Sequence, residues 1–190
     1  MEKAPQAWID YIEGKQVKIM RAWSGRIKSK SDQVPEPSSI EEHAINQLMQ
    51  MDPFDFEKLT VELINEVGSG IVRDLEKTKD RQDGGYDFVG TFVLPEPFQY
   101  EIPFKGEVKR HANAITPNHV SRLVARLDRG EYGVYITTSY FTKQAQEEVF
   151  ELRYPVSLVY GNKLIEMIKA TSNWTSSGVS PKWIKSFEEE

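Results

Sequence analysis

The sequence predicts an α/β fold in which helices flank a mixed central β-sheet, with a helical extension at the N-terminus. In the second half of the chain, β-rich stretches alternate with amphipathic helical ones, which indicates parallel strands covered by helices on both faces. These stretches are residues 133–138, 141–153, 155–160 and 161–168. Two further β-rich runs, residues 86–94 and 104–111, are separated by a proline-rich segment and predict an antiparallel pair.

The helices are predicted from their end signals. Asp52 caps and Pro53 begins a helix that Gly68 ends, and Thr116–Pro117 repeats the same start signal. The first of these helices has a stripe of apolar residues that should be buried, namely Phe56, Leu59, Leu63, Ile64 and Val67. Upstream, residues 5–20 and 40–51 are predicted to be helical and residues 23–39 to form a loop; residues 172–181 are a second predicted loop. We therefore expect a helical extension with a basic loop over residues 1–50 and one domain over residues 51–190.

Composition excludes several classes of protein. The 190 residues are 39 % hydrophobic and 28 % charged, as is usual for a soluble globular chain. No cysteine is present, and the histidines (His43, His111, His119) are scattered, which argues against disulfides and zinc sites. No apolar run approaches the roughly 18 residues of a transmembrane helix, and no signal peptide is recognisable, so we expect a cytoplasmic protein without a membrane segment. The net charge of −5 argues against indiscriminate nucleic-acid binding, but residues 15–30 are basic without an acid, so a local contact with DNA remains open beside a merely solvated surface.

The candidate site lies between Asp87 and Lys109. Along the strand predicted at residues 104–111, Glu107 and Lys109 share one face, roughly 7 Å apart. A hairpin-like return of the chain would bring Asp87 beside Glu107, although strand register cannot be read from sequence. Two carboxylates at a sheet edge suit Mg²⁺, and an adjacent lysine can orient a water molecule or stabilise charge on a phosphate. The alternative is that Glu107 and Lys109 are solvated residues of an edge strand.

Several short motifs together resemble the catalytic domain of Mrr-type restriction endonucleases, a branch of the PD-(D/E)xK nuclease superfamily. The resemblance covers about residues 53–170. Its motifs, in order, are Phe56-Glu57-Lys58-Leu59, Gly84-Gly85-Tyr86-Asp87, Glu107-Val108-Lys109-Arg110, Tyr135 to Thr142 with Ala145, and Val159 to Leu164. One departure from the family pattern is that Tyr86, and not proline, precedes Asp87.

The resemblance implies a restriction-endonuclease-like fold and a metal-dependent DNA endonuclease. Asp87, Glu107 and Lys109 match the catalytic trio, with Mg²⁺ (or Mn²⁺ in its place) bound by Asp87, Glu107 and the Val108 carbonyl, and with Glu57 as a supporting ligand. The products would be a 5′-phosphate and a 3′-hydroxyl. The expected partners are double-stranded DNA, a second copy of the chain in a homodimer or higher oligomer, and a separate recognition domain or subunit, with base modification as a requirement that the sequence leaves open.

Basic residues around this trio are candidates for DNA binding. His119, Arg122, Arg126 and Arg129 recur at helical spacing and would form one stripe, for which the alternative is an ordinary polar helix face. Arg110, Lys77 and Arg81 complete the predicted contacts, and the proline-rich loop at residues 94–103 is expected to flank the cleft. Two other functions remain open: a junction-resolving or repair nuclease on the same fold, and a DNA-binding or assembly module that does not cleave.

Overall fold

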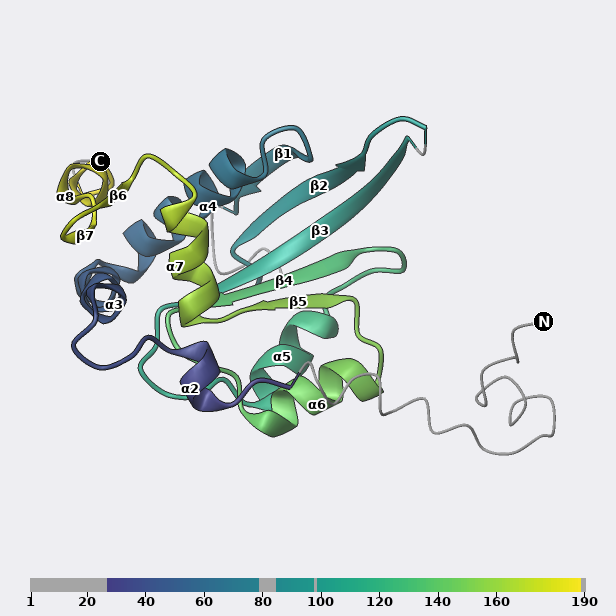
Figure 1. The fold of residues 1–190 in the computed structure, drawn as a ribbon. Helices are drawn as coiled ribbons and strands as arrows, with labels where there is room; N and C mark the ends of the chain where they lie inside the picture. The colour runs from purple at the N-terminus through teal and green to yellow at the C-terminus, as the bar shows by residue number, and fades with distance from the viewer. Residues whose placement is uncertain (1–26, 79–84, 98, 189–190) are drawn as a thin grey trace, which may run out of the picture.

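A five-stranded mixed sheet forms the centre of the protein (Figure 1). The computed structural model describes residues 27–78, 85–97 and 99–188. The strands lie in chain order: β1 (Val72–Lys77), β2 (Phe88–Leu94), β3 (Tyr100–Lys109), β4 (Tyr132–Thr137) and β5 (Val156–Val159). β1, β2 and β3 pair antiparallel, whereas β3, β4 and β5 pair parallel. The predicted mixed sheet is confirmed; the predicted helix at residues 5–20, most of the basic run at residues 15–30 and Arg81 lie outside the described residues.

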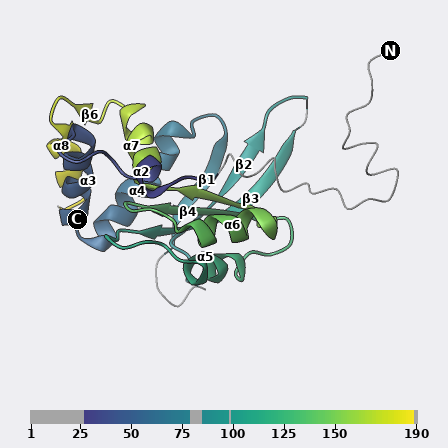
Figure 2. The same ribbon diagram turned by 60° about the horizontal axis from the view of Figure 1, so that its bottom comes forward.

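Helices cover both faces of this sheet (Figures 1 and 2). The bounds of the main helices are α3 (Ile40–Gln50), α4 (Pro53–Val67), α5 (Pro117–Val124), α6 (Lys143–Glu151) and α7 (Gly161–Lys169). One hydrophobic core joins residues of α3, α4 and α7 to Phe88, Phe104 and Val108 of the sheet. A second core joins α5 and α6 to the opposite face, where Tyr135 is fully buried.

Local capping explains where α4 begins and ends. The Asp52 carboxylate accepts a hydrogen bond from the Phe54 N–H at 2.8 Å, and Pro53 occupies the first turn. Gly68 follows the helix, and its N–H donates to the Ile64 carbonyl at 2.8 Å. These signals predict the bounds of α4 correctly. The apolar stripe also predicted burial of Val67, but this last residue of the helix is 38 % exposed.

The N-terminal part of the described chain is tied into the domain. The short helix α2 (Lys30–Gln33) begins at Ser29 with a capping box, where only a loop was predicted. The buried Gln33 side chain accepts from the Phe141 N–H at 2.9 Å and donates to the Phe141 carbonyl at 3.0 Å. In α3, Ala44 and Leu48 are fully buried in the same core as Phe56 of α4, so this core continues across residue 50.

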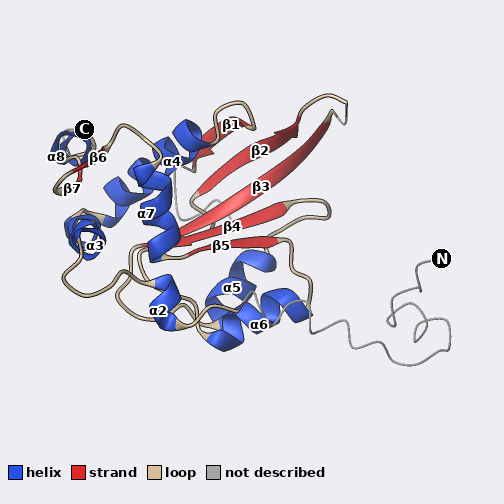
Figure 3. Cartoon of the chain, viewed as in Figure 1, coloured by secondary structure: helices blue, strands red, loops and turns tan. Residues whose placement is uncertain are grey.

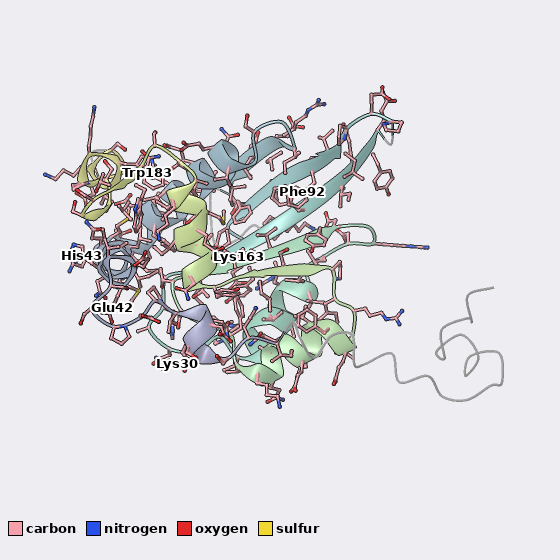
Figure 4. All side chains as sticks on the ribbon, viewed as in Figure 1. Lys30, Glu42, His43, Phe92, Lys163 and Trp183 are labelled. Carbon is pink, nitrogen blue, oxygen red and sulfur yellow. The ribbon has the colours of Figure 1, made fainter. Side chains whose placement is uncertain are left out.

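The C-terminal segment contains a small hairpin that was predicted to be a loop. It is formed by β6 (Trp174–Thr175) and β7 (Gly178–Val179) and is followed by α8 (Pro181–Lys185) (Figure 3). Trp183, labelled in Figure 4, is buried, and its indole N–H donates to the Glu62 carboxylate at 2.7 Å. This contact fastens the tail to α4. Among the described residues, no helix is long and apolar enough to span a membrane.

The hairpin of β2 and β3 places the candidate site at one of its ends. Side chains of β3 alternate as predicted, with Phe104, Gly106 and Val108 buried on the α4 side and with Glu107 on the other. The strands are antiparallel, and Leu94 pairs with Tyr100 at one end while Phe88 pairs with Gly106 at the other. The proline-rich loop therefore lies at the end of the hairpin remote from Asp87, and the expectation that it flanks the cleft is wrong.

Gly106 is required by the close packing of these two strands. A Cβ atom at this position would overlap the ring of Phe88, which is fully buried. We expect Gly106→Ala to lower the free energy of unfolding by about 3 kcal/mol, because the ring has no free space to move into. Urea unfolding followed by circular dichroism measures this change. Gly130→Ala is the reference for backbone strain without overlap, because a Cβ at Gly130 meets no neighbouring atom but its φ of 91° is left-handed. Equal effects of the two substitutions would contradict the packing explanation.

Candidate active site

Backbone hydrogen bonds hold Asp87 against β3. Its N–H donates to the Gly106 carbonyl at 2.8 Å, and its carbonyl accepts from the Thr78 N–H at 2.9 Å. Its carboxylate Oδ2 accepts from the Val108 N–H at 2.6 Å. The predicted approach of Asp87 to the strand that carries Glu107 is therefore present in the structure, and it results from the antiparallel pairing of β2 with β3.

Glu107 belongs to β3, and its side chain is largely shielded from solvent. The parallel register of β3 and β4 pairs Glu107 with Tyr135, whose hydroxyl lies 3.5 Å from Glu107 Oε1. Burial raises the pKa of Tyr135, so its hydroxyl stays protonated and can donate to the carboxylate. The second oxygen, Oε2, is buried without a hydrogen-bond partner among the described residues. Its ion-pair partner is Arg126, with Nη1 at 3.7 Å.

The pKa values of Asp87 and Glu107 are both raised in the folded protein. Burial raises the pKa of Asp87 to about 6, and the Glu57 carboxylate adds to this effect, whereas the Val108 N–H, Lys77 and Arg126 oppose it. Burial also raises the pKa of Glu107, and the charge of Asp87 is the next contribution. Two partly desolvated carboxylates that repel each other are an electrostatically unfavourable arrangement without a cation between them.

The donor set of this site fits a hard divalent cation. Mg²⁺ is usually held by one or two carboxylates while it keeps several water molecules. Glu107 Oε2, which accepts no hydrogen bond from the residues that the structure describes, offers such a ligand. The described residues contain no group of three or more carboxylate or imidazole side chains at metal-binding spacing. Glu57, the expected supporting ligand, pairs with Lys77 at 2.9 Å and acts on Asp87 through its charge.

Lys109 follows Glu107 on the same face of β3. Its charge lowers the proton affinity of both Glu107 and His119, so its side chain lies within electrostatic reach of the carboxylate. Its ammonium makes no hydrogen bond or ion pair with any residue that the structure describes. The backbone at this position is fixed, because the Thr137 hydroxyl donates to the Lys109 carbonyl at 2.8 Å.

The basic residues predicted to bind DNA do not form a single stripe. α5 ends at Val124, so Arg126 and Arg129 lie on the loop that follows and not on the face that carries Arg122. The His119 ring caps its own helix, with Nδ1 accepting from the Thr116 N–H at 3.1 Å, and burial lowers its pKa. The lowered pKa disfavours a positive charge on the His119 ring.

The other predicted DNA contacts have different surroundings. The Arg110 guanidinium donates to the Met49 carbonyl, and its Nε is buried, so this side chain connects the end of β3 to α3. Lys77 forms an ion pair with Glu57, and the charges of both residues act on Asp87. Arg122 and Arg129 are exposed to solvent.

Lys105 is a structural residue that the sequence did not reveal. Its ammonium donates to the Arg126 carbonyl at 3.0 Å and pairs with Asp128 at 3.0 Å and Glu131 at 2.7 Å. Lys105 faces the same side as Glu107, and these contacts fix the loop after α5 against β3. The signal in the sequence was the alternation that put Lys105 on this face, but its partners depend on a tertiary contact.

Replacing Lys105 tests its role in fixing this loop. The side chain is 13 % exposed and its Glu131 partner 17 %, so we expect Lys105→Met to lower the free energy of unfolding by about 3 kcal/mol. Asp128 is 84 % exposed, and Asp128→Ala should change stability by less than about 1 kcal/mol. Urea unfolding of both variants measures these values, and a harmless Lys105→Met would show that the loop is held by other contacts.

Comparison with known proteins agrees with the geometry described above. Residues 48–168 match the Mrr catalytic-domain family of restriction endonucleases, which is more than half of the chain. The chain belongs to this restriction endonuclease family. No curated protein sequence matches it significantly.

Two solved restriction endonucleases share the fold of this family member. The chain superposes on MspJI, solved in complex with a 27-mer oligonucleotide, with a TM-score of 0.76 and 27 % identity, over 100 % of this chain and 45 % of that one. The corresponding values for AspBHI, a DNA modification-dependent restriction endonuclease, are 0.68 and 26 %, over 97 % of this chain and 48 % of that one. The restriction-endonuclease-like fold is thus confirmed, and the chain spans less than half the length of both structures.

Proposed function

We propose that this chain is the catalytic domain of a metal-dependent DNA endonuclease, in which Asp87 and Glu107 bind Mg²⁺ and Lys109 acts on the attacking water. The observation that carries the proposal is the meeting of the Asp87 end of β2 with Glu107 of β3, where a buried carboxylate oxygen has no hydrogen-bond partner within the described part of the chain. Family membership supports the same assignment.

Each residue of the site has a role that follows from its surroundings. A bound Mg²⁺ would lower the pKa of a water molecule and would stabilise negative charge on the phosphate. Asp87 and Glu107 would hold it together with the Val108 carbonyl, and the hydroxyl of Tyr135 keeps the Glu107 carboxylate in orientation. Lys109 orients the water that attacks phosphorus and stabilises the developing charge, since its ammonium has no partner among the described residues. Attack breaks the P–O3′ bond and leaves a 5′-phosphate and a 3′-hydroxyl.

The substrate is proposed to be double-stranded DNA. Arg122, Arg126 and Arg129 lie on α5 and the loop after it, close in sequence to the segment that Lys105 fixes beside the site, and they are our choice for phosphate contacts. One site cuts one strand, so cleavage of both strands requires two copies, which a homodimer supplies most simply. Recognition is assigned to another domain or subunit, and because AspBHI depends on DNA modification, modified DNA is the substrate to test first.

Cleavage of supercoiled plasmid tests this proposal. Modified and unmodified plasmids are incubated with the protein at equal concentration, with Mg²⁺, with Mn²⁺ and with a chelator. We expect nicked or linear product only with metal and none from a folded Glu107→Gln variant. Cleavage that persists in the chelator, or in the variant, would contradict the assignment, and a shift of intact DNA in a gel without any cleavage would indicate a binding module instead.

A further inference from the structure

The Arg126 side chain connects the two segments that carry the proposed metal ligands. Its Nη1 donates to the Gly85 carbonyl at 2.5 Å and lies 3.7 Å from Glu107 Oε2. Gly85 is two residues before Asp87, so one guanidinium touches the turn that leads to one ligand and the carboxylate of the other. The side chain is 32 % exposed, and it therefore forms part of the wall of the site and part of its surface.

Arg126 is held at its backbone and at its guanidinium. Lys105 donates to the Arg126 carbonyl and pairs with Asp128 and Glu131 on the same loop. The guanidinium itself packs against Gly85, which has a φ of 75° and where a Cβ atom would overlap the guanidinium. The left-handed turn at a glycine thus provides the space that the arginine occupies.

The charges explain why a cation is placed here. Glu107 Oε2 has no hydrogen bond among the described residues. The nearby negative charge of Asp87 repels the Glu107 carboxylate. The 3.7 Å separation from Arg126 is an ion pair without a hydrogen bond, so it neutralises charge but leaves the oxygen free to bind another cation.

We propose that Arg126 is a positioning residue that acts as the internal counter-cation of Glu107 and competes with the divalent metal for this carboxylate. The inference rests on the proposed function, because it assumes that Asp87 and Glu107 bind the metal. Arg126 compensates the negative charge of Glu107 and holds the Gly85 turn in place until the metal binds the Glu107 carboxylate. A guanidinium released from Glu107 can donate strong hydrogen bonds to a DNA phosphate. Metal binding and DNA binding are therefore coupled through this side chain.

Metal affinity measured without DNA separates this role from a purely structural one. Binding of Mn²⁺ to the full chain is titrated by electron paramagnetic resonance for the wild type, for two variants that remove the charge (Arg126→Gln and Arg126→Ala) and for Arg126→Lys, which keeps it. Removing a positive charge at this separation should tighten Mn²⁺ binding about tenfold. Arg126→Lys should stay near the wild type, and so should Lys143→Gln, which removes an exposed charge from α6. Circular dichroism and thermal unfolding establish that each variant is folded.

The outcomes distinguish the inference from the proposed function. Tighter Mn²⁺ binding in the charge-removing Arg126 variants, but not in Arg126→Lys or Lys143→Gln, supports competition between Arg126 and the metal. Unchanged or weaker binding in Arg126→Gln and Arg126→Ala overturns it while the metal site of the wild type stands. If the wild type itself binds no Mn²⁺, the proposed metal-dependent function fails, and the role of Arg126 fails with it.

Discussion

The Asp87→Asn variant is expected to lose DNA cleavage and, at the same time, to become more stable than the wild type without metal. Cleavage should fall on the order of 10³-fold, because the site loses a charged metal ligand. Stability should rise because the wild-type carboxylate is partly buried and its pKa is raised to about 6. An amide in the same place can still accept the hydrogen bond from the Val108 N–H. Plasmid cleavage and thermal unfolding in chelator measure the two effects.

The gain in stability from Asp87→Asn should depend on pH, because the pKa of Asp87 is raised in the folded protein. The pKa of Asp87 is higher in the folded protein (about 6) than its ordinary value of 3.8, so the folded state binds the proton more tightly. The stability that protonation contributes is therefore complete below about pH 4 and is lost as the pH rises through 6. The gain from Asp87→Asn should grow over this range to at most about 3 kcal/mol and then level off. An advantage that is independent of pH, or a less stable variant, would contradict the account of a desolvated carboxylate.

The Lys109→Met variant is expected to bind metal but to cleave DNA about 10²- to 10³-fold more slowly. The substitution removes the ammonium, and the backbone hydrogen bond from Thr137 to the Lys109 carbonyl does not depend on the side chain. Single-turnover cleavage measures the rate, and a Mn²⁺ titration measures the metal affinity. Lys143→Met is the matched control, because Lys143 lies on α6 with 76 % of its side chain exposed. Equal rates for the two lysine variants would remove Lys109 from the mechanism.

Features that depend on neighbours in sequence were predictable. The alternation along β3 placed Glu107 and Lys109 on one face, and the Asp52–Pro53 signal gave the start of α4. The approach of Asp87 to Glu107 needed the hairpin, which the two β-rich runs indicated without fixing its register. Family-like motifs then supplied what spacing alone left undecided, namely that an ordinary E-x-K pattern belongs to a nuclease.

Features that depend on where a helix ends and on the register between strands were not predictable. The basic stripe assumed that one helix extends from His119 to Arg129, but α5 ends at Val124, and this places Arg126 against Gly85 and Glu107. The contact of Tyr135 with Glu107 arises from the parallel register of β3 and β4, which no local pattern encodes. The contacts of Lys105 likewise depend on the chain folding back from α5.

A diffraction experiment on crystals containing Mn²⁺ would test the central claim most directly. The account predicts an anomalous peak about 2.1 Å from carboxylate oxygens of both Asp87 and Glu107 and from the Val108 carbonyl. Arg126 Nη1 should then lie farther from Glu107 Oε2 than the 3.7 Å described above. A site that holds no manganese under conditions that support cleavage, or a peak bound by other residues, would contradict the assignment of these two carboxylates as the metal ligands.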